Sequence, residues 1–354
     1  MDHTIYLDEV SDILRADCRR RTFLRRLVTG PAAAAFGSMV SMRSAETAIH
    51  DPGESTVSFV TGSDRRDMVY QALKPLKRDI RRGIRGKKVI IKPNLVGNEQ
   101  ILSATHPDAL RGILDFLKPI CKETVYIGES TGRRYYGKSG TFTHYRLYNY
   151  TKLENEYNVK LIDLNERPYI VRWVVGREGH PLDIRIIETF LDPNVYFISA
   201  CRFKIHNCMI ATLSAKNMLM GAPLPDGTRH DKGRMHSAGY RNMHFNFFQL
   251  AQKIRPQLAV IDGLVGMEGN GPTMGDPVEH GVALAGTDFV SADRIGCYLM
   301  GVNFDDVGYL TYCANAGLGQ GDMSKIRIIG PDPAPYVKHY RLHERIEEHL
   351  MWKY

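Results

Sequence analysis

The chain has 354 residues, of which 43% are hydrophobic and 24% are charged, and it carries a formal net charge of +8. This composition is typical of a globular protein with a sizeable core and excludes a chain too polar to fold. A length of about 150 residues per domain predicts two domains or one large two-lobed domain. No apolar run approaches the roughly 20 residues that a membrane span needs, so we expect no transmembrane span in the mature chain.

The N-terminal segment has the pattern of an export signal. Arg20 and Arg21, followed by Phe23 and Leu24, precede a mildly apolar stretch rich in alanine and glycine. Paired arginines before a weakly hydrophobic region resemble a twin-arginine signal. The sequence therefore predicts a leader over residues 1–48, the twin-arginine translocase as a partner, and a periplasmic or exported location. A basic leader or anchor helix of another kind is the alternative.

Strands and helices alternate through most of the remaining chain. The predicted strands cover residues 55–62, 87–96, 124–130, 159–165, 195–206, 257–266, 279–287 and 324–330. The predicted helices cover residues 64–84, 106–120, 144–157, 211–221, 245–256 and 289–301. Near-continuous apolar strands between helices are typical of an α/β fold, with a mostly parallel sheet and helices on both faces.

Three further patterns complete the predicted organisation. Residues 166–176 and 182–190 predict an added antiparallel strand pair. Two segments, one starting at "VIIKPNLV" and one at "LAVIDGLVG", share the order strand, polar loop and helix. They predict two related lobes facing one cleft, although chance similarity of two βα units is an equal alternative. The α/β domain would cover residues 49–330, and residues 331–354 would form a C-terminal helical tail.

The basic run from Leu73 to Lys88 could bind nucleic acid or form the solvated face of a helix followed by a strand. We favour the helix face and expect no nucleic-acid partner, because the run has no interleaved aromatic residues and no nucleic-acid fold motif accompanies it.

Short metal motifs are weak or missing. None of the six cysteines forms a C-x-x-C pair, which excludes zinc-ribbon, thioredoxin-like and ferredoxin-type motifs. In "HERIEEH" (343–349), Glu347 stands where H-E-x-x-H needs its second histidine, so we expect an exposed helix face. "RHDKGRMH" (229–236) is interpreted as a polar loop, either a mobile lid or plain solvent-exposed chain. The sequence identifies no cofactor and no metal.

Polar side chains stand where several predicted strands end. In open parallel sheets, ligands bind beyond the carboxyl ends of the strands. Lys204 and His206 lie two residues apart on one strand and therefore share a face. The polar residues at strand ends or just after them are Lys92, Asn94, Glu129, Lys204, His206, Asp262, Lys216 and Asn217.

Residues 263–281 form a glycine-rich stretch that we interpret as a loop able to approach a ligand closely. It has no G-x-x-x-x-G-K-[ST] motif, and a strand rather than a helix follows it, so neither nucleotide-binding pattern applies. Glu268, Asn270 and Asp276 are the groups that it could contribute. We expect a positive φ at Gly269 or Gly271.

Several of these stretches together resemble a known family. The combination of K-x-H-N with K-N-M and the loop "DGLVGMEGNGP" is similar to the domain of unknown function 362 family, from about Val89 to Gly330. The family is uncharacterised as a biochemical class. The resemblance therefore implies a fold neighbourhood and no reaction.

The residues themselves predict an anion-binding cleft, and the leading hypothesis is an enzyme that acts on a small carboxylate or phosphate compound. Converging lysines would bind the anion, and a carboxylate with an imidazole could move protons at neutral pH. The expected catalytic residues are Lys204, His206, Lys216, Asp262 and Glu268. The expected ligand-binding residues are Lys92, Asn94, His106, Glu129, Asn217 and Asn270. The alternative is a non-catalytic binding or assembly factor for an exported complex.

Overall fold

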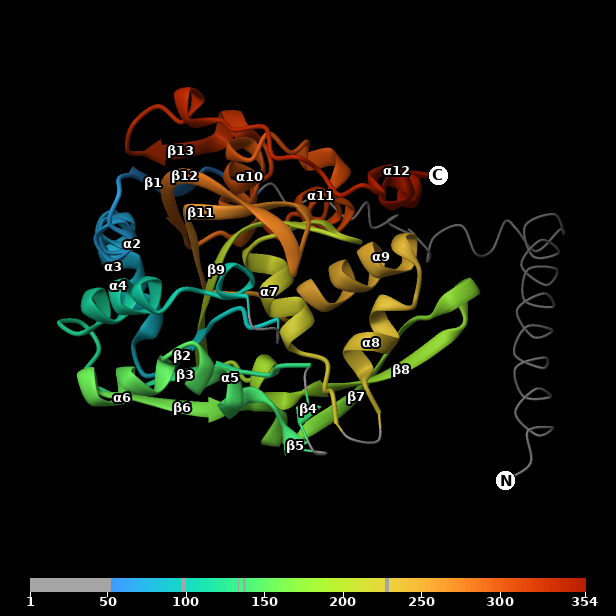
Figure 1. Ribbon diagram of the computed structural model, residues 1–354, viewed down its shortest axis with the longest axis horizontal. Coiled ribbons are helices and arrows are strands. Elements are labelled where there is room, and N and C mark those ends of the chain that lie inside the picture. The colour runs from blue at the N-terminus through green and yellow to red at the C-terminus, as the bar shows by residue number, and fades with distance from the viewer. Residues whose placement is uncertain (1–51, 97–99, 133, 136–137, 227–228) are drawn as a thin grey trace, which may run out of the picture. The chain divides into compact units, whose positions relative to one another are not determined.

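The computed structural model of the protein describes residues 52–354, except 97–99, 133, 136–137 and 227–228 (Figure 1). The predicted leader, with Arg20 and Arg21, lies outside the described residues. No helix in the described part is long and apolar enough to cross a membrane.

Among the described residues, nine strands form one main sheet, in which β10 (Ile210–Thr212) pairs only with β9. The other strands, in their order across the sheet, are β13 (Ile326–Ile329), β1 (Ser55–Thr61), β12 (Met274–Gly286), β11 (Leu258–Asn270), β9 (Val195–His206), β2 (Lys88–Lys92), β3 (Val125–Glu129) and β6 (Val159–Asp163). Strand β12 runs antiparallel to both neighbours, and the other pairs along this order are parallel. The predicted mostly parallel sheet is confirmed.

Strand β9 lies inside the sheet, and all twelve of its residues are buried. Phe197, Phe203 and Ile205 pack into the core on one face, whereas Tyr196 and Ile198 pack into the core on the other. This two-sided burial explains why the strand is apolar almost throughout, as expected for a parallel sheet covered on both faces. Strands β2 and β11, which begin the two similar segments, flank β9 in this same sheet.

Helices cover both faces of the sheet (Figure 1). The helices packed on the Tyr196 face are α2 (Arg65–Leu73), α3 (Lys77–Ile84), α4 (Pro107–Leu117), α5 (Thr141–Leu147) and α6 (Leu153–Glu156). Those packed on the Phe203 face are α7 (Ser214–Gly221), α8 (Asp231–His236), α9 (Tyr240–Ala251), α10 (Phe289–Leu299), α11 (Gly308–Asn315) and α12 (Ile346–Leu350).

Two predicted helices are each divided in the structure. The helix predicted over residues 64–84 is interrupted by the 3-10 helix Lys74–Leu76, because Pro75 has no backbone N–H to continue the α-helix. The arginines Arg78, Arg81 and Arg82 of the basic run lie exposed on α3, the second half. Residues 144–157 divide into α5 and α6 around Asn149, whose φ of 60° is left-handed.

The glycine-rich stretch predicted as a loop is instead a long hairpin, so this prediction was wrong. Strand β11 continues to Asn270, β12 begins at Met274, and Glu268 pairs with Asp276 between them. The strand signal was hidden because five glycines interrupt the residues that form the two strands' outer ends. The positive φ expected in this stretch is confirmed at Gly269, with φ 71°.

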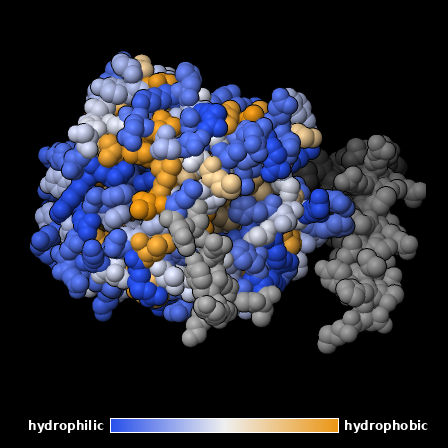
Figure 2. All heavy atoms as spheres, in the orientation of Figure 1, coloured by the Kyte–Doolittle hydropathy of each residue, from blue (hydrophilic) through white to orange (hydrophobic). Residues whose placement is uncertain are grey.

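The expected antiparallel pair is confirmed as β7 (Tyr169–Val175) and β8 (Pro181–Ile187), a separate two-stranded sheet. A second small sheet pairs β4 (Arg134–Tyr135) with β5 (Lys138–Ser139). On the face shown in Figure 2, hydrophilic residues dominate the described surface, and hydrophobic residues gather in a band near its middle.

Helix α7 follows β10 (Ile210–Thr212) and begins without a capping side chain of its own. Asp293 of α10 accepts hydrogen bonds from the backbone N–H groups of Ser214 and Ala215, both at 2.9 Å, and from Ser214 Oγ at 2.6 Å. The carboxyl is fully buried, and burial raises its pKa to about 7. A side chain from another helix thus supplies the acceptors that the first turn of α7 needs.

We therefore expect Asp293→Ala to lower the free energy of unfolding by about 2–3 kcal/mol, because buried donors at the start of α7 lose their acceptor. Urea denaturation followed by circular dichroism measures the change. The exposed Asp305→Ala is the matched control and should change stability by less than about 0.5 kcal/mol. Equal stability of the two variants would show that Asp293 does not hold α7.

Candidate functional site

A cavity of about 830 Å³ opens at the carboxyl ends of β2, β3 and β9 and is bordered by α7 and α8. This is the edge of the sheet at which parallel α/β proteins bind ligands. Basic, polar and thiol side chains from several chain segments line it: Lys92, Asn94, Glu129, Arg177, His206, Cys208, Lys216, Asn217, His230, Lys232, His236, Tyr240 and Arg345.

A buried ion pair forms the floor of the cavity. Lys92 Nζ, at the end of β2, lies 2.7 Å from Glu129 Oε1, at the end of β3, and both side chains are about 97% buried or more. Glu129 also accepts hydrogen bonds from the backbone N–H groups of Leu95 and Ser130, at 3.0 and 2.7 Å. A side chain at Gly221 would collide with the Lys92 stem, so α7 can approach this closely only with glycine there. The pair therefore ties two strands and α7 together.

Asn217 of α7 extends this network across the sheet. Its Oδ1 accepts from Lys92 Nζ at 3.1 Å and from Asn94 Nδ2 at 3.2 Å. Its Nδ2 donates to the Lys92 carbonyl and to Ser199 Oγ, both at 3.0 Å. All four hydrogen-bonding positions of the amide are used, which fixes the orientation of the side chain.

Lys204 lies beneath the cavity and does not line it. Its ammonium donates to Asn94 Oδ1 and to the Ser103 carbonyl, both at 2.6 Å, and the side chain is fully buried. Burial, and secondly the nearby Lys216, hold the pKa of Lys204 well below its usual range. Through Asn94, Lys204 supports the ligand-facing residues from below.

Two lysines line the cavity on the side of α7 and α8. Lys232 donates to the carbonyls of Met220 and Gly221, at 2.6 and 2.9 Å, and to Ser130 Oγ at 3.2 Å, and burial lowers its pKa to about 7. Lys216 is about 95% buried, and within the described chain its side-chain ammonium has neither a hydrogen bond nor an ion pair. Burial lowers the pKa of Lys216 to about 8, and the charge of Lys92 acts in the same direction.

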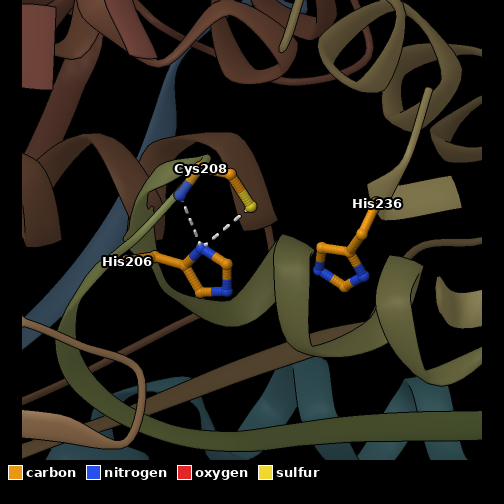
Figure 3. Close-up of side chains that lie close together, drawn as sticks. All are labelled: His206, Cys208 and His236. Atoms are coloured by element: carbon orange, nitrogen blue, oxygen red, sulfur yellow. Dashed lines mark hydrogen bonds between the residues drawn. The ribbon is translucent and has the colours of Figure 1, made fainter. Parts of the chain in front are cut away.

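His206, Cys208 and His236 meet at another part of the wall (Figure 3). His206 Nδ1 lies 3.4 Å from Cys208 Sγ, and the two imidazole rings are nearly parallel with centroids 6.1 Å apart. Burial lowers the pKa of His236 to about 4, and it raises the pKa of the Cys208 thiol to about 11. Burial also holds the pKa of His206 well below its usual range, so both imidazoles are neutral at pH 7. The His206 Nδ1 lone pair accepts a hydrogen bond from the Cys208 N–H at 3.2 Å.

The structure brings six of the expected residues to the cavity wall, and Lys204 to the layer beneath it. The six are Lys92, Asn94, Glu129, His206, Lys216 and Asn217. His106, in contrast, caps α4, where its Nδ1 accepts from the Asp108 N–H at 3.1 Å.

Asp262 does not share the cavity, which corrects the expected convergence. Its partner in the sheet register is Arg202, whereas that of Lys92 is Ser199. Positions 199 and 202 of β9 point to opposite faces, so Asp262 and Lys92 do too. Asp262 instead forms an ion pair with Arg65 of α2 at 2.8 Å.

Glu268 and Asn270 also lie away from the cavity wall, because the hairpin carries them to the C-terminal segment. Glu268 Oε2 accepts from the Arg341 N–H at 2.9 Å, and Asn270 Nδ2 donates to Glu344 Oε2 at 3.1 Å. Neither side chain lines the cavity, whereas Pro272 and Thr273, in the turn of the same hairpin, do.

Sequence reasoning missed Cys208, Lys232 and His236. The last two belong to the segment interpreted as a polar loop, which is in fact the helix α8. Their spacing of four residues was a usable signal, because residues i and i+4 of a helix share a face. Cys208 had no C-x-x-C partner, and although His206 lies two residues before it, the third member of the group, His236, comes from a separate segment.

Comparisons with known proteins place the chain among similar proteins without assigning a reaction. A family model described as "Domain of unknown function (DUF362)" matches residues 89–298. The thylakoid-associated protein sll1697 of Synechocystis sp. (strain ATCC 27184 / PCC 6803 / Kazusa) is 27% identical over 220 residues, which cover 59% of this chain and 62% of that protein.

Two solved structures are similar in part. The lactate racemase apoprotein of Thermoanaerobacterium thermosaccharolyticum has a TM-score of 0.43 and 14% identity, covering 70% of this chain and 57% of that one. A Thermotoga maritima protein has a TM-score of 0.34 and 13% identity, with 77% and 62% covered. Both TM-scores are too low to support an argument about function.

The floor of the cavity generates a stability prediction. Glu129→Gln should lower the free energy of unfolding by about 3–5 kcal/mol, because it removes one partner of a buried ion pair and leaves the other charge uncompensated. Asp79→Asn, which removes the exposed Asp79–Arg82 pair on α3, is the matched control and should cost at most about 1 kcal/mol. Urea denaturation of both variants tests the difference. Similar small losses would contradict a structural role for the buried pair.

Proposed function

This chain belongs to the DUF362 family, and from the cavity at its sheet edge we propose that it binds a small anionic compound and transfers a proton on it. The observation that supports this most strongly is Lys216, an almost fully buried amine that reaches the cavity without a partner of its own. Burying a charged group is costly unless an opposite charge or hydrogen bonds compensate it. A bound carboxylate or phosphate would supply both.

The charge around the cavity supports the same conclusion. Lys92, Lys216, Lys232, Arg177 and Arg345 line it. Among its described lining residues the carboxylate is Glu129, which Lys92 already neutralises. A volume of about 830 Å³ suits a small molecule. The excess of positive charge therefore favours an anionic ligand.

Proton transfer is the chemistry that Lys216 supports. A pKa of about 8 leaves both the ammonium and the neutral amine populated near neutral pH, which suits a general acid or base. In this proposal the anion is held by the lysines, and the amine of Lys216 takes or returns the proton. The substrate would be a small carboxylate or phosphate compound with an acidic proton near its charged group.

A second candidate is a non-catalytic binding or assembly role. An exposed apolar stripe on β7 favours it: Tyr169, Val171 and Trp173 alternate along the strand and are 48%, 46% and 66% exposed. Large exposed apolar patches often mark sites at which another protein binds. The two roles differ in the use of Lys216, because an assembly surface on β7 does not require it.

Export through the twin-arginine route is part of the proposal, and Arg20 with Arg21 is the feature that supports it. We expect the double variant Arg20→Lys, Arg21→Lys to stay in the cytoplasm, because the translocase reads the paired guanidinium groups. Fractionation of the native host, followed by immunoblotting, measures the distribution. Recovery of the double variant outside the cytoplasm at the level of the unaltered protein would remove this proposal.

The binding proposal predicts that Lys216→Met weakens anion affinity by about tenfold or more, since a hydrogen bond to a charged group contributes about 1.5–3 kcal/mol. The fold should stay intact, because Lys216 holds no described residue in place. Isothermal titration calorimetry with malonate and inorganic phosphate at pH 7 measures the change. The exposed Lys118→Met is the control and should bind as the unaltered protein does. Unchanged affinity of Lys216→Met would contradict the proposal.

The same interaction predicts a pH dependence. Lys216 loses its charge as the pH rises through about 8, so malonate affinity should fall across this range and should be flatter in Lys216→Met. Malonate itself stays ionised there, so the change reports the protein. Lys216 interacts electrostatically with six other titratable groups around it, which are Lys92, Lys204, His206, Cys208, Lys232 and His236.

A further inference from the structure

We propose that His206, Cys208 and His236 form a binding site for one divalent cation of the zinc class, in the wall of the same cavity. Within the described chain, these three residues are a group of potential ligands whose donor atoms all lie within 4.8 Å of one another. The site goes beyond the proposed anion binding and does not depend on it, because a different set of side chains makes it.

The spacing of the donor atoms fits a small ion. Zinc bonds of about 2.0 Å to nitrogen and about 2.3 Å to sulfur place tetrahedral ligand atoms roughly 3.5 Å apart. The separation from His206 Nδ1 to Cys208 Sγ is 3.4 Å, and a metal bound to this nitrogen would replace the hydrogen bond that it accepts from the Cys208 N–H at 3.2 Å. Figure 3 shows the two imidazole rings side by side, with the Cys208 thiol directed toward the space between them. Small side-chain rotations would close the three donors around one ion.

His236 is already held in the state that a metal ligand needs. Its Nδ1 lies 2.8 Å from the Lys232 carbonyl oxygen, so this nitrogen carries the proton and donates it to the carbonyl. Nε2 is then the ring nitrogen with a free lone pair. Metal-binding histidines typically donate their second ring N–H to such a backbone oxygen, which fixes both the tautomer and the ring orientation.

The backbone around Cys208 is held in an unusual conformation. His206 is the last residue of β9, and Ile210, the first residue of β10, pairs with it. Ile210 has a φ of +66°, in the left-handed region that a β-branched residue rarely adopts. Such strain persists only where the surroundings hold it and gathers at functional sites. The strained residue lies two positions after Cys208, at the start of β10.

The donor set indicates both the ion and its use. Two imidazoles and one thiolate suit zinc, and three protein ligands leave the fourth position of a tetrahedral ion open, as in catalytic rather than structural zinc sites. On binding, the Cys208 S–H bond breaks, the sulfur binds the cation as thiolate, and the proton leaves to solvent. A cation held by these residues would lie in the cavity wall, where the oxygen of a bound anion could reach it together with Lys216.

Cobalt(II) is the probe that tests this site, because thiolate ligation gives it a charge-transfer band in the near ultraviolet. We expect metal-free, full-length protein to bind one equivalent with a tetrahedral spectrum, and zinc to displace it. Cys208→Ser should lose the charge-transfer band, and His236→Gln should bind cobalt at least about tenfold more weakly. Cys121→Ser is the matched control, since Cys121 is also half-buried but lies outside the cavity.

Circular dichroism of each variant separates loss of ligation from loss of fold. An octahedral cobalt spectrum without a thiolate band, or equal spectra for Cys208→Ser and the unaltered protein, would overturn the site. Lys216→Met should keep the thiolate band and the binding of one equivalent of cobalt, because Lys216 supplies no ligand atom. Failure of the anion proposal would therefore appear in Lys216→Met, whereas failure of the metal proposal would appear in Cys208→Ser and His236→Gln.

Discussion

The buried ion pair between Lys92 and Glu129 is the constraint on which the rest of the site depends. It joins the ends of two parallel strands and, through Asn217, the helix that follows β9 and β10. Because both charges are removed from water, each must keep its partner, and the strand ends and α7 are held in one arrangement. Asp293 then fixes the first turn of α7 from the opposite side. Lys216 projects from α7, and because the helix itself is held in place, its side chain is positioned without a polar contact of its own.

The wall of the cavity carries an unpartnered amine and a group of neutral nitrogen and sulfur donors. It can therefore bind both an anion and a cation. The ammonium suits an anion, and the donors of His206, Cys208 and His236 suit a cation. Both are reached from the same cavity. An anionic ligand held between a metal ion and Lys216 would have its negative charge stabilised from two sides, which lowers the cost of removing a proton beside it.

The sequence predicted the sheet and most of this wall because both depend on local patterns. Apolar runs located β2, β3 and β9, and their last residues Lys92, Glu129 and His206 follow from the rule for parallel strand ends. The prediction for Asp262 was wrong because the face to which its side chain points, relative to that of Lys92, depends on the register between strands. The sequence of a single strand does not reveal this register. Lys232 and His236 were missed because the short helix α8 is mostly polar, contains Gly233 and has no apolar periodicity. Its helical form depends on tertiary contacts such as the Asp231–Arg185 pair.

The most direct test of the central claim is the pKa of Lys216, measured by nuclear magnetic resonance on protein with isotopically labelled lysine side chains. The Lys216→Met variant assigns the signal. We expect a pKa of about 8 in the free protein, because the amine is buried without a partner, and a clear rise when malonate is bound. A pKa near the ordinary value of 10.5, unchanged by malonate, would contradict the account.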